Sequence, residues 1–86
     1  MDISEKVRKL IEAKVNDLGV IVDSIEYVKE GNNYFLKIVI DKEDYVDVDT
    51  CVEVTKLINP LLDEADIIKD SYILDISSKE RGENNE

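Results

Sequence analysis

The chain has 86 residues, no histidine and one cysteine, and its formal net charge is −10. This length allows one domain with one hydrophobic core. Without histidine the sequence lacks the most common general base and metal ligand, and no Ser-His arrangement can form. The acidic balance disfavours general binding to nucleic acid, which depends on cations that neutralise phosphates. A basic protein partner fits this charge better, and an acidic surface that only keeps the protein soluble is the alternative.

Residues 2–18 predict an amphipathic helix, because apolar residues recur at spacings of three and four. The apolar stripe consists of Ile3, Val7, Leu10, Ile11 and Leu18. Asp2 is a suitable N-cap with Glu5 three residues later, and Gly19 provides a left-handed stop. The basic residues of this helix are Lys6, Arg8, Lys9 and Lys14. We interpret them as a solvated face, and contact with a phosphate backbone is the alternative.

Residues 20–29 and 34–41 predict two strands of an antiparallel hairpin, with a turn at 30–33. In the second strand Leu36, Ile38 and Ile40 share one side, which predicts a sheet with one buried face. In the first strand both faces are partly apolar, so the pattern leaves open which face meets the helices.

A second helix is expected to begin near Asp47, which is a good N-cap. Its predicted apolar stripe is Val48, Cys51, Thr55, Ile58 and Leu62, and Val54, Leu57 and Leu61 widen it. On this stripe Cys51 is expected to pack in the core rather than to react. Pro60 predicts a kink or an early stop, because it removes a helical hydrogen bond. A polar connection at 63–70, anchored by Ile67 or Ile68 or both, then leads to a third strand over 71–77.

The element order is therefore α-β-β-α-β, which predicts an α+β fold. We expect a two-layer α/β sandwich with two helices on one face of a three-stranded mixed sheet. The crossover through the second helix makes strands 34–41 and 71–77 parallel. Residues 1–78 form the predicted domain, and the polar residues 79–86 form a tail that is expected to be disordered.

An acidic loop joins the second strand to the second helix, and Lys42 is its only cation. Its acidic residues are Asp41, Glu43, Asp44, Asp47 and Asp49. The spacing does not match a calcium loop, which has Gly at position six and Glu at position twelve, where this chain has Val46 and Val52. We interpret the loop as a docking surface for a basic protein. A solvated loop that caps the helix is the competing interpretation, and neither interpretation involves a metal, a cofactor or a catalytic group.

Several short stretches occur in a family-specific order over residues 4 to 78. They are Leu18-Gly19, the strand 22–28, the strand 36–41 with its acidic turn, the helix start Val48–Cys51, Leu61-Leu62-Asp63 and the strand Tyr72–Ser78. In this order and spacing the chain resembles the N-terminal domain of the ribosome maturation factor RimP family. In that family a Pro-Gly segment usually follows the serine pair and leads to a C-terminal β-barrel of SH3-like type. Here Ser77-Ser78 is followed by the polar residues 79–86.

The resemblance implies a non-enzymatic factor that binds the immature small (30S) ribosomal subunit in the bacterial cytoplasm and helps it mature. One cysteine and apolar runs of no more than three residues fit a cytoplasmic protein without a membrane span. Direct nucleic-acid binding by this domain is expected to be weak at most. The alternative function is a stand-alone acidic protein-interaction or regulatory domain without a ribosomal role, dimeric through an exposed sheet edge. The sequence leaves the oligomeric state open.

Overall fold

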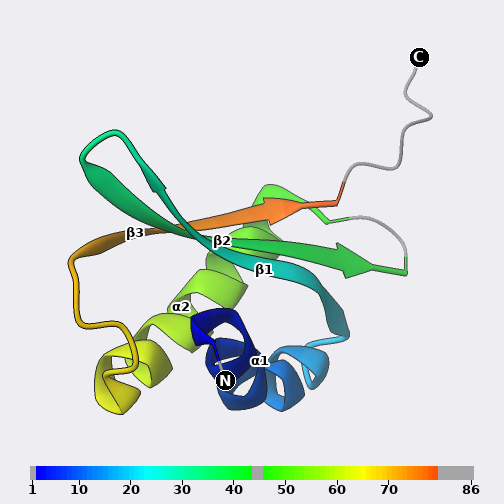
Figure 1. The fold of residues 1–86 in the computed structure, drawn as a ribbon. Helices are drawn as coiled ribbons and strands as arrows, with labels where there is room; N and C mark the ends of the chain where they lie inside the picture. The colour runs from blue at the N-terminus through cyan, green and yellow to red at the C-terminus, as the bar shows by residue number, and fades with distance from the viewer. Residues whose placement is uncertain (1, 44–45, 80–86) are drawn as a thin grey trace.

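The computed structural model describes residues 2–43 and 46–79. In chain order the elements are α1 (Ile3–Asn16), β1 (Val20–Glu30), β2 (Asn33–Lys42), α2 (Val48–Ala65) and β3 (Tyr72–Ser78). Figure 1 shows α1 and α2 side by side on one face of the sheet. The predicted α+β fold and its element order are confirmed.

The sheet has the strand order β1-β2-β3, so β2 lies in the middle. β1 pairs with β2 in antiparallel fashion and β2 pairs with β3 in parallel, as predicted. Gly31 adopts a φ of +65° in the hairpin turn, a conformation that glycine accepts without steric cost. Both β1 and β3 are edge strands within the described part of the chain.

A β-bulge in β1 decides which of its residues face the helices. Val20 and Val22 are buried, but the register shifts between Val22 and Ser24. Beyond the shift Ile25 and Tyr27 pack against the core instead. One extra residue in a strand moves every following side chain to the opposite face, which explains why β1 is apolar on both faces in the sequence.

The core lies between the sheet and the two helices. β2 contributes three fully buried side chains to it, in keeping with its central position. The buried apolar residues are Val7, Ile11, Val15, Val20, Val22, Leu36, Ile38, Ile40, Val54, Ile58, Leu62 and Ile68. Ile68 and, in part, Ile67 anchor the connection before β3, as expected. No helix of the described residues is long and apolar enough to cross a membrane.

Helix α1 begins where it was predicted, because Asp2 accepts a hydrogen bond of 2.9 Å from the backbone N–H of Glu5. Gly19 follows it with a φ of +79°. The assignment of Leu18 to the buried stripe is wrong. Leu18 lies beyond the last helical residue and is exposed, while Val15 occupies the buried position one turn earlier.

Helix α2 continues through Pro60 to Ala65, so of the two outcomes predicted at Pro60 the early stop does not occur. Pro60 and Lys56 are both exposed, so the Lys56 carbonyl that lacks its usual donor can be solvated. The helix ends at Asp66, which adopts a left-handed φ of 53°. Residues 63–65, predicted as connection, therefore belong to the last helical turn.

The buried face of α2 is turned slightly from the predicted stripe, since Cys51 and Thr55 are only half-buried. Thr50, Val54, Ile58 and Leu62 are the buried positions. Val48 is 77% exposed, so its assignment to the stripe is wrong. The buried positions recur every four residues, and extending them back from Ile58 reaches Thr50 rather than Val48.

Lys79 continues the edge of the sheet past β3. Its backbone N–H donates to the Ile40 carbonyl at 2.8 Å, and its ammonium lies 3.1 Å from the Asp23 carboxylate. Residues 80–86 lie outside the described residues, so the disordered tail over 79–86 stays a prediction.

Candidate docking surface

Four of the five predicted acidic residues lie in the described part of the chain, between the end of β2 and the first turn of α2. Asp41 is the next-to-last residue of β2, and its carboxylate accepts a hydrogen bond of 2.8 Å from the backbone N–H of Lys42. Glu43 and Asp49 are exposed, and Asp44 lies outside the described residues. Asp47 has a structural role of its own.

Asp47 is the N-cap of α2. Its carboxylate accepts hydrogen bonds from the Thr50 hydroxyl at 2.7 Å and from the Thr50 backbone N–H at 2.8 Å. These two bonds, with the hydroxyl contributing most, lower the pKa of Asp47 below its ordinary value of 3.8. Asp47 is therefore held as a carboxylate by the helix that it caps, as the sequence predicted.

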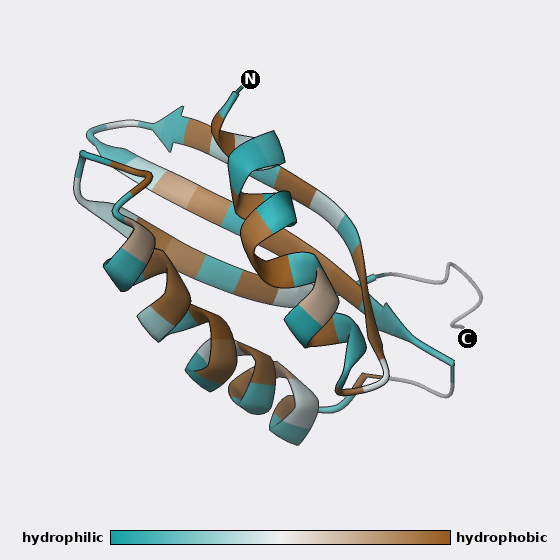
Figure 2. Cartoon of the chain, turned by 90° about the horizontal axis from the view of Figure 1, so that it is seen from below, coloured by the Kyte–Doolittle hydropathy of each residue, from teal (hydrophilic) through white to brown (hydrophobic). Residues whose placement is uncertain are grey.

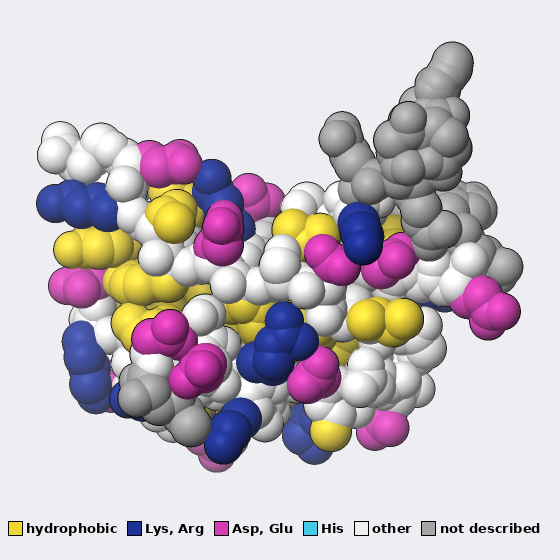
Figure 3. Space-filling view, turned by 45° about the vertical axis from the view of Figure 1, so that its right-hand side comes forward, with side chains coloured by type: hydrophobic (Ala, Val, Ile, Leu, Met, Phe, Trp, Pro, Cys, Tyr) yellow, Lys and Arg dark blue, Asp and Glu magenta, His cyan; other side chains and the backbone are white. Residues whose placement is uncertain are grey.

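Acidic side chains are not confined to this loop. On the face shown in Figure 3 they are spread from one end of the molecule to the other, with Lys and Arg side chains between them. A basic partner would therefore meet a broadly negative surface. The net charge of −10 favours its approach from any direction, and local contacts decide where it docks.

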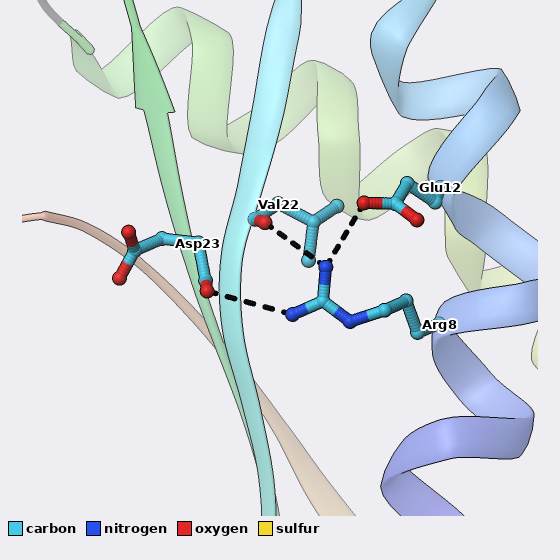
Figure 4. Close-up of polar contacts among 4 residues, drawn as sticks. All are labelled: Arg8, Glu12, Val22 and Asp23. Atoms are coloured by element: carbon cyan, nitrogen blue, oxygen red, sulfur yellow. Dashed lines mark hydrogen bonds and ion pairs between the residues drawn. The ribbon is translucent and has the colours of Figure 1, made fainter.

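Arg8 has a role that sequence reasoning missed. Its guanidinium donates to the backbone carbonyls of Val22 at 3.2 Å and Asp23 at 3.4 Å, and to the Glu12 carboxylate at 2.9 Å (Figure 4). The two carbonyls belong to the bulge of β1, where the ladder is interrupted. Arg8 thus links α1 to the backbone of β1 at the point where the register shifts. In the sequence, the only sign of this role is that Arg8 precedes the acidic Glu12 by one helical turn in a helix rich in basic residues.

The remaining basic residues of α1 behave differently from Arg8. Lys6, Lys9 and Lys14 are exposed, in line with a solvated face. Since Arg8 is engaged at the bulge, the phosphate-binding alternative depends on these three lysines alone.

Cys51 packs against the core from the side of α2, as expected. Burial first, and then the nearby Asp47 carboxylate, raise the pKa of its thiol. A raised pKa keeps the thiol protonated and unreactive. In residues 2–43 and 46–79 no group of three acidic or cysteine side chains could hold a metal ion.

These features define a class of protein, a small two-layer α+β domain with an acidic surface. The family comparison makes the assignment specific, because the family model described as RimP N-terminal domain matches residues 10–79. The chain belongs to the RimP N-terminal domain family, as its motifs indicated. RimP is a ribosome maturation factor that is associated with the 30S subunit and is generally non-enzymatic, so membership indicates a role in ribosome maturation.

Proposed function

We propose that this domain is a non-catalytic binding module that assists small-subunit assembly. It docks through its acidic surface on a basic ribosomal protein of the immature 30S subunit, in the cytoplasm. Residues 41–49 supply the acidic contacts closest to α2. The observation that carries the proposal is the match to the RimP N-terminal domain over residues 10–79.

The charge of the chain supports a protein partner rather than RNA as the direct contact. A net charge of −10 repels phosphate and attracts basic proteins. Glu43 and Asp49 are exposed, so both carboxylates can reach a partner without changing the fold. Asp47 adds charge at the same end while it caps α2.

Co-sedimentation with immature small subunits at several salt concentrations tests the proposal. We expect binding that weakens as salt rises, because contacts between exposed charges are screened. In a variant with Asp44, Asp47 and Asp49 changed to Asn, we expect affinity to fall about tenfold or more. Asparagine is also a good N-cap, so this variant keeps the start of α2.

A charge-matched control separates the contribution of the loop residues to binding from the contribution of the net charge. Changing Asp17→Asn, Glu26→Gln and Glu64→Gln also takes the net charge from −10 to −7, at exposed positions outside the loop. Equal loss in both triple variants would assign binding to net charge alone. No co-sedimentation of the unchanged chain at low salt would refute the ribosomal role and favour the stand-alone interaction domain.

A further inference from the structure

The outer edge of β3 has unpaired backbone groups. The Lys79 N–H points toward β2, where it meets the Ile40 carbonyl. Backbone groups alternate in direction along a strand, so the N–H and C=O groups of Leu74 and Ile76 point the other way, out of the sheet. In the described part of the chain no strand pairs with this edge. A fourth strand would find these groups free to bond.

An apolar flank of α2 lies next to that edge. Val48 and Val52 are 77% and 44% exposed, and with Cys51, Thr55 and Lys56 they line a shallow depression of about 300 Å³. At about 100° per residue, Val48 lies roughly 100° and Val52 roughly 140° around α2 from the mean direction of Val54 and Ile58, so this surface begins beside the buried face and turns toward solvent. We call this surface the α2 flank.

Two observations place the α2 flank on the β3 side of the molecule. Figure 2 shows α2 running along the β3 side of the sheet, with α1 between α2 and β1. Asp63 lies farther along the same side of α2. Burial is the main cause that raises the pKa of the Tyr72 phenol in β3, and the negative charge of the nearby Asp63 carboxylate is the second cause. The α2 flank therefore borders the position that a strand added to β3 would occupy.

The face of the sheet that points away from the helices would contact the other side of a strand added to β3. Ile73 is 47% exposed there, and its neighbour on the same face of β3 is the exposed Asp75. Side chains of an added strand alternate between the two faces. One row would lie against Val48 and Val52, and the other row beside Ile73 and Asp75.

We propose that the open edge of β3, together with the α2 flank, takes up an extended basic segment of a partner protein as a fourth strand. Pairing to a sheet edge supplies main-chain hydrogen bonds, and the flank selects apolar side chains in one row. The basic character follows from Asp63 and Asp75 on either side of the edge and from the net charge of −10. That charge also disfavours a second copy of this chain as the occupant.

A designed peptide tests the edge directly. An eight-residue peptide of alternating lysine and valine, added to the isotope-labelled chain, is expected to slow amide hydrogen exchange at Leu74 and Ile76 at least tenfold. The same peptide with N-methyl groups on alternate residues keeps its charge and side chains but cannot pair, and it is expected to give no protection. Equal exchange with and without the first peptide, or equal protection by both peptides, would overturn the proposal.

Matched variants test the α2 flank. Val52→Lys introduces a cation opposite the basic peptide and is expected to weaken its binding about tenfold. Leu18→Lys is the control, because Leu18 is 42% exposed and follows α1 rather than α2. Equal effects of the two substitutions would contradict a role for the flank.

The biological partner of this edge rests on the proposed function, and the two can fail separately. If the chain does not sediment with immature small subunits but the peptide protects β3, the ribosomal role fails and the edge site stands. If the chain sediments but the peptide gives no protection of Leu74 and Ile76, the edge proposal fails and the ribosomal role stands. Protection of Leu74 in the chain alone, with a doubled mass by light scattering, would make a second copy the occupant and overturn the proposal.

Discussion

The two edge strands of the sheet differ in how they are protected. β1 carries a bulge whose carbonyls are bonded by Arg8, and the Asp23 side chain pairs with Lys79. β3 is a regular strand of seven residues without a register shift in its pairing with β2. Bulges and charges at an edge are common means of preventing a further strand from pairing. By this criterion β1 is blocked and β3 is open.

The two edges therefore have different roles: the contacts at β1 stabilise the fold, and β3 is the edge proposed to bind a partner. Arg8 connects α1 to β1 and holds the irregular end of the hairpin, so its role is structural. The α2 flank presents the exposed Val48 and Val52, and the outer edge of β3 presents free backbone groups, while the Leu74 and Ile76 side chains pack against the core. Both edge strands expose backbone donors and acceptors, but within the described residues only β3 combines a regular edge with the neighbouring α2 flank.

The largest effect is expected at the strand that supports both edges. Leu36 in β2 is fully buried, so Leu36→Ala should lower the free energy of unfolding by about 2–5 kcal/mol. Urea denaturation followed by circular dichroism measures the loss. Ile73→Ala on the half-exposed β3 edge is the control and should cost less than about 1 kcal/mol. Similar losses at the two positions would contradict the placement of the core.

Arg8→Met sharpens the contrast at the blocked edge. It removes the donors to the Val22 and Asp23 carbonyls and should lower the free energy of unfolding by about 1–3 kcal/mol. Lys9→Met, an exposed neighbour, should stay within about 0.5 kcal/mol of the unchanged chain. Amide exchange should accelerate near the bulge and not in β3. If Arg8→Met is as stable as Lys9→Met, the bulge does not depend on Arg8.

The start of α2, which carries the exposed flank, should respond to pH. The folded state lowers the pKa of Asp47, so its charge stabilises the fold above the ordinary value of 3.8 and this contribution is lost as pH falls through the folded value. From about pH 5 downward, the melting temperature of the unchanged chain should therefore fall a few degrees more than that of Asp47→Asn. Identical pH profiles in thermal unfolding would show that the carboxylate does not stabilise the cap.

The smallest effect is expected at the ion pair beside the bulge. Lys79 and Asp23 lie 3.1 Å apart, but both side chains are partly exposed. Exposed pairs are screened, so Lys79→Met should change the free energy of unfolding by no more than about 0.5 kcal/mol. Chemical denaturation measures this change. If the free energy of unfolding fell by several times this amount, the ion pair would stabilise the fold as much as Arg8 does.

The sequence predicted elements that local chemistry determines. Asp2 and Asp47 mark both helix starts, Gly31 marks the turn, and the alternation in β2 marks its buried face. The bulge in β1 was not predictable, because the strand pattern does not show where the register shifts, and the Arg8 that bonds its carbonyls lies fourteen positions earlier. The start of the stripe in α2 was misassigned, because several apolar residues fit helical spacing and only packing against the sheet decides between them. That misassignment hid Val48, which is the most exposed large apolar residue in the described part of the chain.

The same limit applies to the candidate site. The sequence identified the acidic residues around α2, and the helix cap among them, from composition and spacing. The open edge depends on which backbone groups of β3 point away from β2, and this follows only from the register of the pairing. A seven-residue strand pattern is the same for an edge strand and a central strand.

Amide hydrogen exchange of the chain bound to immature small subunits, compared with the free chain, tests the contrast between the two edges most directly. The account predicts slower exchange at Leu74 and Ile76 and in the first turn of α2, with unchanged exchange along β1. Protection along β1 with none at Leu74 and Ile76 would contradict it, because the blocked edge would then be the one that binds.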